Sequence, residues 1–332
     1  MFLLRCAFLL LSLTVNSVMK KYNRDEKQLG AWPMPFHPNS LIQDPQTALY
    51  LSINEKLERL PKGSIPLCEG KGTNYTPELT GTGFGIHVGT FKKLITAGHV
   101  TDRLTDKQFY VPNHGQLRRF DCSIHRFGHA EASRSQDPID ISVIDLDEQQ
   151  ADQLSAYHFF KLEELEHRHF LAPDCHYAFV GYPATKNQGK FKATQVGMHL
   201  FRYSGMSIGS DKHVALNRPS ETHLGIAFEK NCIGSDSKPF TAPDPNGISG
   251  CPVWSLGTAP EIADVANTKT PLISGMGIEY RDHALIAVRA CLILQVVRAL
   301  HGELKTVIEE CPHVRLEHRG PVKHRQLILK GP

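Results

Sequence analysis

Short apolar stretches follow one another from about residue 81 to about residue 290, and they limit the possible folds more than any other feature of the chain. Glycine, proline and polar residues separate them, and several alternate apolar with polar residues, as half-buried β-strands do. The stretches are GFGIHVG, KKLITAG, QFYV, ISVIDL, HYAFVGYPAT, KATQVGMHLFRYSG, THLGIAFEK, CPVWSLG, LISGMGIEY and ALIAVRA. Counting them predicts an all-β sandwich or barrel.

Helical patterns flank this β-rich region. Asp44 and Pro45 match an N-cap followed by proline at the first helical position, and apolar residues then repeat at helical spacing up to Pro61. This predicts a helix at about 45–60. A second amphipathic helix is predicted within 291–310, with one apolar face formed by Ile293, Val296, Val297, Leu300 and Leu304.

Composition indicates an ordinary globular protein. Of the 332 residues, 41% are hydrophobic and 21% are charged, which is enough for one large core or two smaller ones. The net charge of +3 is too small to indicate a nucleic-acid partner, and the basic stretch at 314–332 is of a kind that is usually solvated. No apolar run reaches the roughly 18 residues that a membrane-spanning helix needs.

Residues 1–18 form a candidate signal peptide, with Arg5 as the early positive charge, an apolar centre and small residues near Ser17. Met19 offers an alternative start. Export to the periplasm or the exterior follows if residues 1–18 are a signal peptide, and a cytoplasmic location follows otherwise. The eight cysteines contain no CxxC pair, which argues against a zinc ribbon or redox motif and favours reduced thiols without excluding export.

Two motifs contain a candidate nucleophile and a candidate base. GISGCPVW contains Ser249 next to glycines, a composition that also occurs in ordinary turns. A serine hydroxyl becomes a useful nucleophile only when a neighbouring imidazole accepts its proton. LITAGHV places His99 at the end of a predicted strand, with small residues around it.

A third motif, DPIDISVIDLD, contains the candidate acid. Asp140 directly precedes the alternating apolar residues of a predicted strand. Asp137 is the rival, because Asp-Pro also matches turn chemistry. Asp140 is preferred because an acid at the mouth of an apolar strand needs a polar partner.

The order His99, Asp140, Ser249 and the surrounding motifs TAGH, DISVI and GISGCP resemble the chymotrypsin-like (trypsin-fold) serine peptidases, including the bacterial-type trypsin-like peptidase domain. That family has a TAAH motif, a DIALL-type strand and a GxSGGP motif. The resemblance covers about residues 78–290. It implies two packed antiparallel β-barrels of the six-stranded type, with an N-terminal and a C-terminal helix.

The resemblance also implies the role of each site residue. Ser249 attacks a scissile carbonyl, His99 takes the hydroxyl proton and returns it to the leaving amine, and Asp140 holds the imidazole. The backbone N–H groups of Gly247 and Ser249 form the oxyanion hole. The implied substrate is a protein or peptide, and no cofactor or metal is implied.

The implied domain organisation places the two barrels on either side of a polar linker. The expected parts are a possible signal peptide at 1–18, an extension at 19–77, a first barrel at 78–147, a linker at 148–170, a second barrel at 171–290, and a helix with a basic tail at 291–332.

Several positions depart from the family pattern. Ile248 replaces the aspartate that precedes the nucleophile in digestive members, and no Ile-Val-Gly-Gly start is visible, so we expect an enzyme made in its active form. Val100 occupies the position of a common disulfide, and Cys251 replaces a glycine. Pro243 occupies the position that influences substrate preference, with Asp244 beside it, so the cleavage preference stays open.

Alternatives to a working peptidase remain. The fold could serve a catalytically silent, peptide-binding relative, because three residues in sequence order do not establish their distances. An α/β-hydrolase esterase needs a Gly-x-Ser-x-Gly turn and strands that alternate with helices, which the pattern lacks. The glycines of GTGFGIHVG fail the dinucleotide register. Glu166, His167 and His169 lack further ligands for a metal site.

Overall fold

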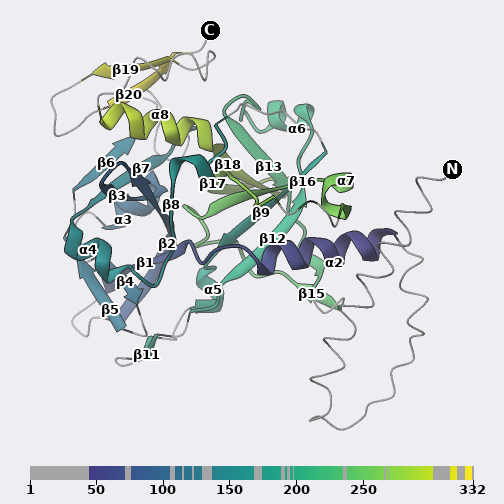
Figure 1. Cartoon of the computed structure of the whole chain (residues 1–332), viewed down its shortest axis with the longest axis horizontal. Coiled ribbons are helices and arrows are strands. Elements are labelled where there is room, and N and C mark those ends of the chain that lie inside the picture. Colours follow the sequence, from purple (N-terminus) through teal and green to yellow (C-terminus); the bar gives the residue numbers. More distant parts are fainter. Residues whose placement is uncertain are drawn as a thin grey trace.

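The computed structural model describes residues 45–71, 76–104, 109–113, 116–121, 123–128, 137–167, 174–187, 191–192, 195–196, 198–234, 238–264, 267, 269–301, 315–319 and 326–330. The candidate signal peptide at 1–18 and the alternative start at Met19 lie outside these residues, as do 19–44 and 72–75 of the predicted N-terminal extension. The end of the predicted C-terminal helix, at 302–310, and part of the basic tail also lie outside them. Figure 1 shows the described chain as two β-sheets side by side with helices around them.

The first sheet has eight strands in the order β5-β4-β1-β2-β3-β7-β6, with β8 pairing β2 in parallel and the other pairs antiparallel. The long β2 pairs with β1 on one side and β3 on the other, so it lies at the centre. The strands are β1 (Ser64–Lys71), β2 (Thr76–Val88), β3 (Phe91–Ala97), β4 (Phe109–Asn113), β5 (Gln116–Phe120), β6 (Ile124–Phe127), β7 (Ile141–Leu146) and β8 (Phe159–Phe160).

The second sheet has six strands in the order β12-β9-β16-β17-β18-β13, all paired antiparallel. Its two edge strands also meet, through a bridge between Ser207 and Ile226 and a hydrogen bond of 2.9 Å from Ile208 N–H to Gly225 O. The strands are β9 (Cys175–Gly181), β12 (Phe201–Met206), β13 (His223–Ala227), β16 (Pro252–Thr258), β17 (Ile273–Arg281) and β18 (Ala284–Arg289).

The described chain is therefore mostly antiparallel β-sheet with few helices, which confirms the all-β prediction. The first sheet has eight strands rather than six. One reason is that β8, from the predicted linker, adds to β2. The mostly antiparallel sheets do not match the α/β-hydrolase fold of the esterase alternative, which needs parallel strands that alternate with helices.

In sequence, the two longest helices precede and follow the β-rich region. α8 (Ala290–Leu300) packs on β17 and β18, and α2 (Pro45–Glu58) packs against α7 (Ala259–Ala263). No helix within the described residues is long and apolar enough to cross a membrane. The remaining elements are α3 (Gly98–Leu104), α4 (Glu148–Gln153), η4 (Leu162–Glu164), α5 (Ala184–Asn187), α6 (Ser210–Ala215), and the hairpins β10 (Phe191–Lys192) with β11 (Gln195–Val196), β14 (Asn231–Ile233) with β15 (Pro239–Thr241) and β19 (Arg315–Arg319) with β20 (Gln326–Lys330).

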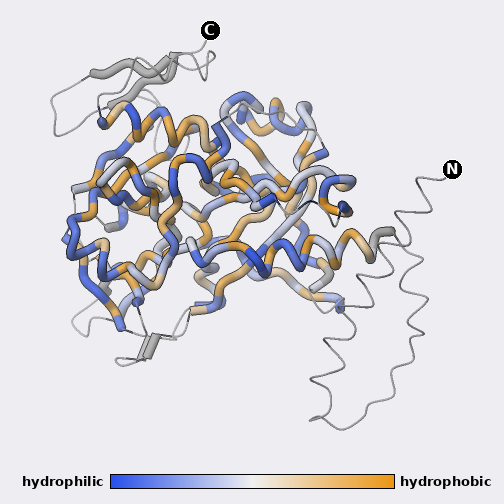
Figure 2. The backbone as a smooth tube through the Cα atoms, viewed as in Figure 1, coloured by the Kyte–Doolittle hydropathy of each residue, from blue (hydrophilic) through white to orange (hydrophobic). Residues whose placement is uncertain are grey.

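A single large apolar cluster joins the two sheets. Phe160 of β8 lies edge-on to Phe84 of β2 at 6.3 Å and to Trp254 of β16 at 5.2 Å, so one ring from the linker contacts both sheets. Figure 2 shows hydrophobic and hydrophilic residues mixed along the backbone of the described chain. Burying a side chain of this size stabilises a fold by about 1.5–3 kcal/mol, so Phe160 of β8 contributes to the contact between the two sheets.

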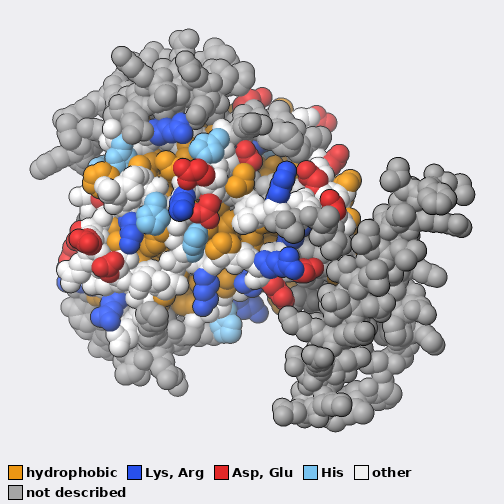
Figure 3. All heavy atoms as spheres, viewed as in Figure 1, with side chains coloured by type: hydrophobic (Ala, Val, Ile, Leu, Met, Phe, Trp, Pro, Cys, Tyr) orange, Lys and Arg blue, Asp and Glu red, His pale blue; other side chains and the backbone are white. Residues whose placement is uncertain are grey.

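The surface carries both charge signs. Figure 3 shows lysine, arginine, aspartate and glutamate side chains interspersed over one face of the described chain. This agrees with the small net charge of +3.

Candidate active site

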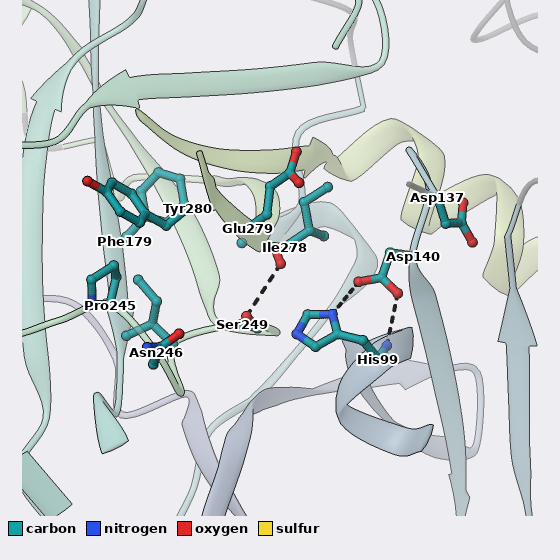
Figure 4. A pocket seen from close by; sticks show the side chains of 12 residues that line it. His99, Asp137, Asp140, Phe179, Pro245, Asn246, Ser249, Ile278, Glu279 and Tyr280 are labelled. Carbon is teal, nitrogen blue, oxygen red and sulfur yellow. Dashed lines mark hydrogen bonds and ion pairs between the residues drawn. The ribbon is translucent and has the colours of Figure 1, made fainter. Parts of the chain in front are cut away.

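His99 and Asp140 of the first sheet form a hydrogen-bonded pair. β3 ends at Ala97, and α3 begins directly after it, which places His99 in the first turn of a helix. The imidazole Nδ1 lies 2.5 Å from Asp140 Oδ2, and the backbone N–H of His99 donates to Asp140 Oδ1 over 2.9 Å (Figure 4). Because a carboxylate only accepts, the Nδ1 carries the proton in the neutral ring, which leaves Nε2 as the acceptor.

The backbone of Asp140 is held in an uncommon conformation. Its φ of 43° lies in the left-handed region, which aspartate tolerates better than most residues. Its carbonyl accepts the N–H of Gly98 over 2.7 Å. Asp137 instead accepts the N–H of Ile139 over 2.9 Å, and its side chain is directed away from the imidazole in Figure 4. The geometry favours Asp140 over Asp137 as the partner of His99.

Ser249 lies in a tight turn of the second sheet that only glycines allow. Gly247 has a φ of 95° and Gly250 has a φ of 89°. A Cβ atom on Gly247 would lie 2.8 Å from the backbone nitrogen of Ala184, and one on Gly250 would lie 1.9 Å from the carbonyl oxygen of Thr82. Both the backbone angles and the space therefore require glycine.

Thr82 of β2 attaches this turn to the first sheet. Its N–H donates to Ser249 O over 2.8 Å, and its hydroxyl donates to Gly247 O over 2.9 Å. The same hydroxyl accepts the N–H of Tyr182 over 3.1 Å, and the Thr82 carbonyl accepts the hydroxyl of Thr96 over 2.6 Å. One fully buried threonine thus fixes the serine turn relative to the strand that leads to His99.

The backbone N–H groups of Gly247 and Ser249 donate to no other described residue. A trans peptide directs its N–H opposite to its carbonyl, and the carbonyls of both peptide groups are engaged in backbone hydrogen bonds. These bonds are Ala184 N–H to Asn246 O at 2.6 Å and Cys251 N–H to Ile248 O at 2.9 Å. The turn therefore holds two N–H donors in fixed directions next to the serine.

His99, Asp140 and Ser249 line one cleft of about 390 Å³. The Ser249 hydroxyl donates to the carbonyl of Ile278 over 3.4 Å, a long contact, and no line joins it to His99 in Figure 4. The other lining residues are Asp137, Phe179, Pro245, Asn246, Ile248, Gly277, Ile278, Glu279 and Tyr280. The sequence-predicted residues thus share a cleft, with the serine turned toward β17.

One wall of the cleft is formed by the end of β17, which contributes apolar, aromatic and acidic residues. Tyr280 of β17 lies edge-on to the buried Phe228 at 5.3 Å. Glu279 is paired with the buried Arg218, whose Nε and guanidinium nitrogen lie 2.6 and 3.2 Å from its carboxylate oxygens. This pairing offsets the negative charge on the wall.

The cysteine beside the nucleophile turn is inert. Cys251 is fully buried, and burial raises the pKa of its thiol to about 12. Its Sγ would lie 3.0 Å from a Cβ atom added at Gly277. Cys251 therefore acts as a small packing residue. The free cysteines among the described residues are Cys68, Cys175, Cys232, Cys251 and Cys291.

Several residues at the site have no sequence signal. Thr82, Arg218 and Ile278 belong to ordinary strand or loop patterns, and each meets its partner over a long sequence separation. No group of three or more metal-ligating side chains occurs within the described part of the chain. Glu166 and His167 are described there, but His169 lies outside it.

Comparisons with known proteins give no family assignment. No family model matches the chain, and no curated protein matches it. A solved structure described as "Aromatic interactions drive the coupled folding and binding of the intrinsically disordered Sesbania mosaic virus VPg protein" is 13% identical, with a TM-score of 0.40, covering 73% of this chain and 92% of that one. The MamO protease domain from Magnetospirillum magneticum is 9% identical, with a TM-score of 0.38, covering 73% and 98%.

Proposed function

We propose that this chain is a serine endopeptidase of the chymotrypsin-like class, with its cleft between two barrels. The observation that carries the proposal is the 2.5 Å contact between His99 Nδ1 and Asp140 Oδ2 in a cleft that Ser249 also lines. The bridge between Ser207 and Ile226 supports a closed second barrel. The proposed second barrel lies within residues 171–290, and the proposed first barrel extends beyond 78–147, because it includes β1 (Ser64–Lys71) and β8 (Phe159–Phe160).

The reaction is acyl transfer through a serine ester. Ser249 Oγ attacks the scissile carbonyl carbon while its proton passes to His99 Nε2. The N–H groups of Gly247 and Ser249 donate to the oxyanion. The C–N bond then breaks, and the leaving amine takes the proton from Nε2. Water next attacks the ester with the same base, which releases the carboxylic acid and restores the serine.

Asp140 contributes by orientation and charge. Its Oδ2 accepts the Nδ1 proton, which keeps Nε2 free to accept the proton of the serine, and its charge stabilises the imidazolium that forms. The side chain is buried, with 6% of its surface exposed, so water competes little for this hydrogen bond. The fully buried Thr82 keeps the nucleophile turn in place beside this pair.

A catalytically silent, peptide-binding protein is the second candidate. It is favoured by the Ser249 hydroxyl, which donates to Ile278 O rather than to the imidazole. Rotation about one side-chain bond reorients a serine hydroxyl, and catalytic hydrogen bonds are often loose without substrate. The peptidase proposal requires this rotation when substrate binds.

Labelling with an organophosphonate separates the two candidates. Wild-type protein becomes labelled, Ser249→Ala does not, and Ser210→Ala, which alters an exposed serine on α6, labels like the wild type. Circular dichroism checks that the variants are folded. Equal labelling of wild type and Ser249→Ala overturns the nucleophile assignment, and an unlabelled wild type that still binds peptides supports the silent alternative.

A further inference from the structure

His223 is a buried histidine that links the second sheet to the loop carrying Asp140. It begins β13, and only 1% of its surface is exposed. Its Nε2 lies 2.6 Å from the carbonyl oxygen of Pro138, two residues before Asp140. Its Nδ1 lies 2.8 Å from the hydroxyl of Thr222. The two sheets thus meet at the acid loop through one imidazole.

The partners of His223 determine which nitrogen carries the proton. Burial, with a smaller contribution from Arg218 and His213, lowers the pKa of His223 to about 4, so the ring is neutral near pH 7. Carbonyl oxygens only accept hydrogen bonds, and Nε2 lies 2.6 Å from Pro138 O whereas Nδ1 lies 3.3 Å from Pro219 O, so Nε2 carries the single ring proton and donates it to Pro138. Nδ1 then faces the Thr222 hydroxyl, whose single proton is shared between Nδ1 at 2.8 Å and the carbonyl oxygen of Pro219 at 3.2 Å.

The loop that receives this hydrogen bond has a conformation that needs support. Asp140 has a φ of 43°. A residue other than glycine keeps such a backbone conformation only when the surrounding structure holds it there. The first sheet holds Asp140 itself, through Gly98 N–H at 2.7 Å and His99 N–H at 2.9 Å. His223 holds the loop on the other side, just before Asp140.

We propose that His223 is a positioning residue, which fixes the Pro138 carbonyl and thereby keeps the Asp140 carboxylate aimed at His99. The kinetic part of this inference rests on the proposed peptidase function. The structural part does not, because the hydrogen bond between His99 and Asp140 exists without substrate.

Two amide substitutions at position 223 distinguish the effect of the hydrogen-bond donor from the effect of side-chain volume. In His223→Gln the amide nitrogen reaches the place of Nε2 and still donates to Pro138, whereas in His223→Asn it reaches only the place of Nδ1. We expect His223→Asn to lower kcat about tenfold, the size of one lost hydrogen bond, with KM within about twofold. His223→Gln should stay within about threefold of wild-type kcat.

Proton NMR measures the hydrogen bond between His99 and Asp140 directly, without requiring catalysis. The proton shared by His99 Nδ1 and Asp140 Oδ2 should give a far-downfield resonance in wild type and in His223→Gln, and that resonance should weaken or move upfield in His223→Asn. His176→Asn is the matched control, because His176 is another buried histidine of the same sheet that does not line the cleft. It should leave the resonance unchanged.

The outcomes distinguish the two proposals. An inactive wild type with the expected resonance pattern overturns the peptidase function and supports positioning by His223. If the wild type is active, the positioning role is overturned when kcat of His223→Asn equals the wild-type value. It is also overturned when His223→Asn and His223→Gln lower kcat equally. If thermal unfolding shows that His223→Asn does not fold, His223→Leu replaces it, because leucine fills a similar volume and has no donor for Pro138. An unchanged resonance in folded His223→Leu overturns the proposal.

Discussion

His99 and Asp140, in the first sheet, are joined by hydrogen bonds to a carboxylate side chain, whereas the Ser249 turn, in the second sheet, depends on two glycines and on hydrogen bonds to its backbone. The first arrangement depends on a carboxylate and a ring that match in charge and direction. The second depends on space, because Gly247 and Gly250 have no room for a side chain. We therefore expect activity to be lost in two ways: by removing charge at the His99–Asp140 pair, and by adding side-chain volume at the Ser249 turn.

Removing the charge of the acid should have the largest effect. In Asp140→Asn the amide can hold the imidazole with its proton on the wrong nitrogen, so we expect kcat to fall by about 10⁴ with little change in KM. Asp137→Asn is the matched control, because the amide oxygen can still accept the Ile139 N–H, and its kcat should fall by less than about tenfold. Steady-state kinetics on a peptide substrate checks both. Comparable losses would assign the acid to Asp137.

Adding volume to the nucleophile turn should have the next largest effect. Gly247→Ala places a methyl group against Ala184 and should misdirect an N–H of the oxyanion hole, lowering kcat by about 10²–10³. Gly89→Ala is the control, because Gly89 has a φ of 58° but open space around it. It should cost about 1 kcal/mol of stability and leave kcat unchanged. A kcat for Gly247→Ala close to the wild-type value would contradict the space argument.

Acid should remove the contribution of His223, in the second sheet, at a higher pH than that of Asp145, in the first. Burial lowers the pKa of His223 from 6.5 to about 4, so the unfolded chain binds the proton more readily. The stabilisation is therefore complete above about pH 6.5 and decreases as the pH falls to about 4, by about 3 kcal/mol. Urea unfolding across this range measures it. His223→Gln should reduce the slope, and an unchanged slope would show that other groups cause it.

Removing a charge from the first sheet should have the smallest effect. Burial alone would raise the pKa of Asp145, but hydrogen bonds from His125 and Lys93 lower it to about 2, so its stabilisation decreases only as the pH falls from about 3.8 to about 2. The carboxylate is 37% exposed, so we expect Asp145→Asn to cost about 1 kcal/mol at pH 7. Thermal unfolding at pH 7 and pH 3 checks this. A larger loss at pH 3 than at pH 7 would contradict it.

The strand pattern allowed the all-β fold to be predicted, because alternation along a half-buried strand is a local property of the sequence. Motif order also allowed His99, Asp140 and Ser249 to be chosen as candidates. The strand count of the first sheet was not predictable in the same way. β8 consists of two phenylalanines in a polar stretch, which is no strand pattern. It forms a strand by pairing with β2, and Phe160 packs against the rings of Phe84 and Trp254.

The sequence by itself determined the alternating strands, the two turn glycines and the residue types available for proton transfer. The sequence favoured Asp140 over Asp137, but only the tertiary structure decided that its carboxylate reaches the His99 ring, that Thr82 holds the serine turn, and that His223 contacts the acid loop. The reason is physical. Hydrogen bonds between residues 41, 165 and 85 positions apart depend on how the sheets pack, and no local pattern records that distance.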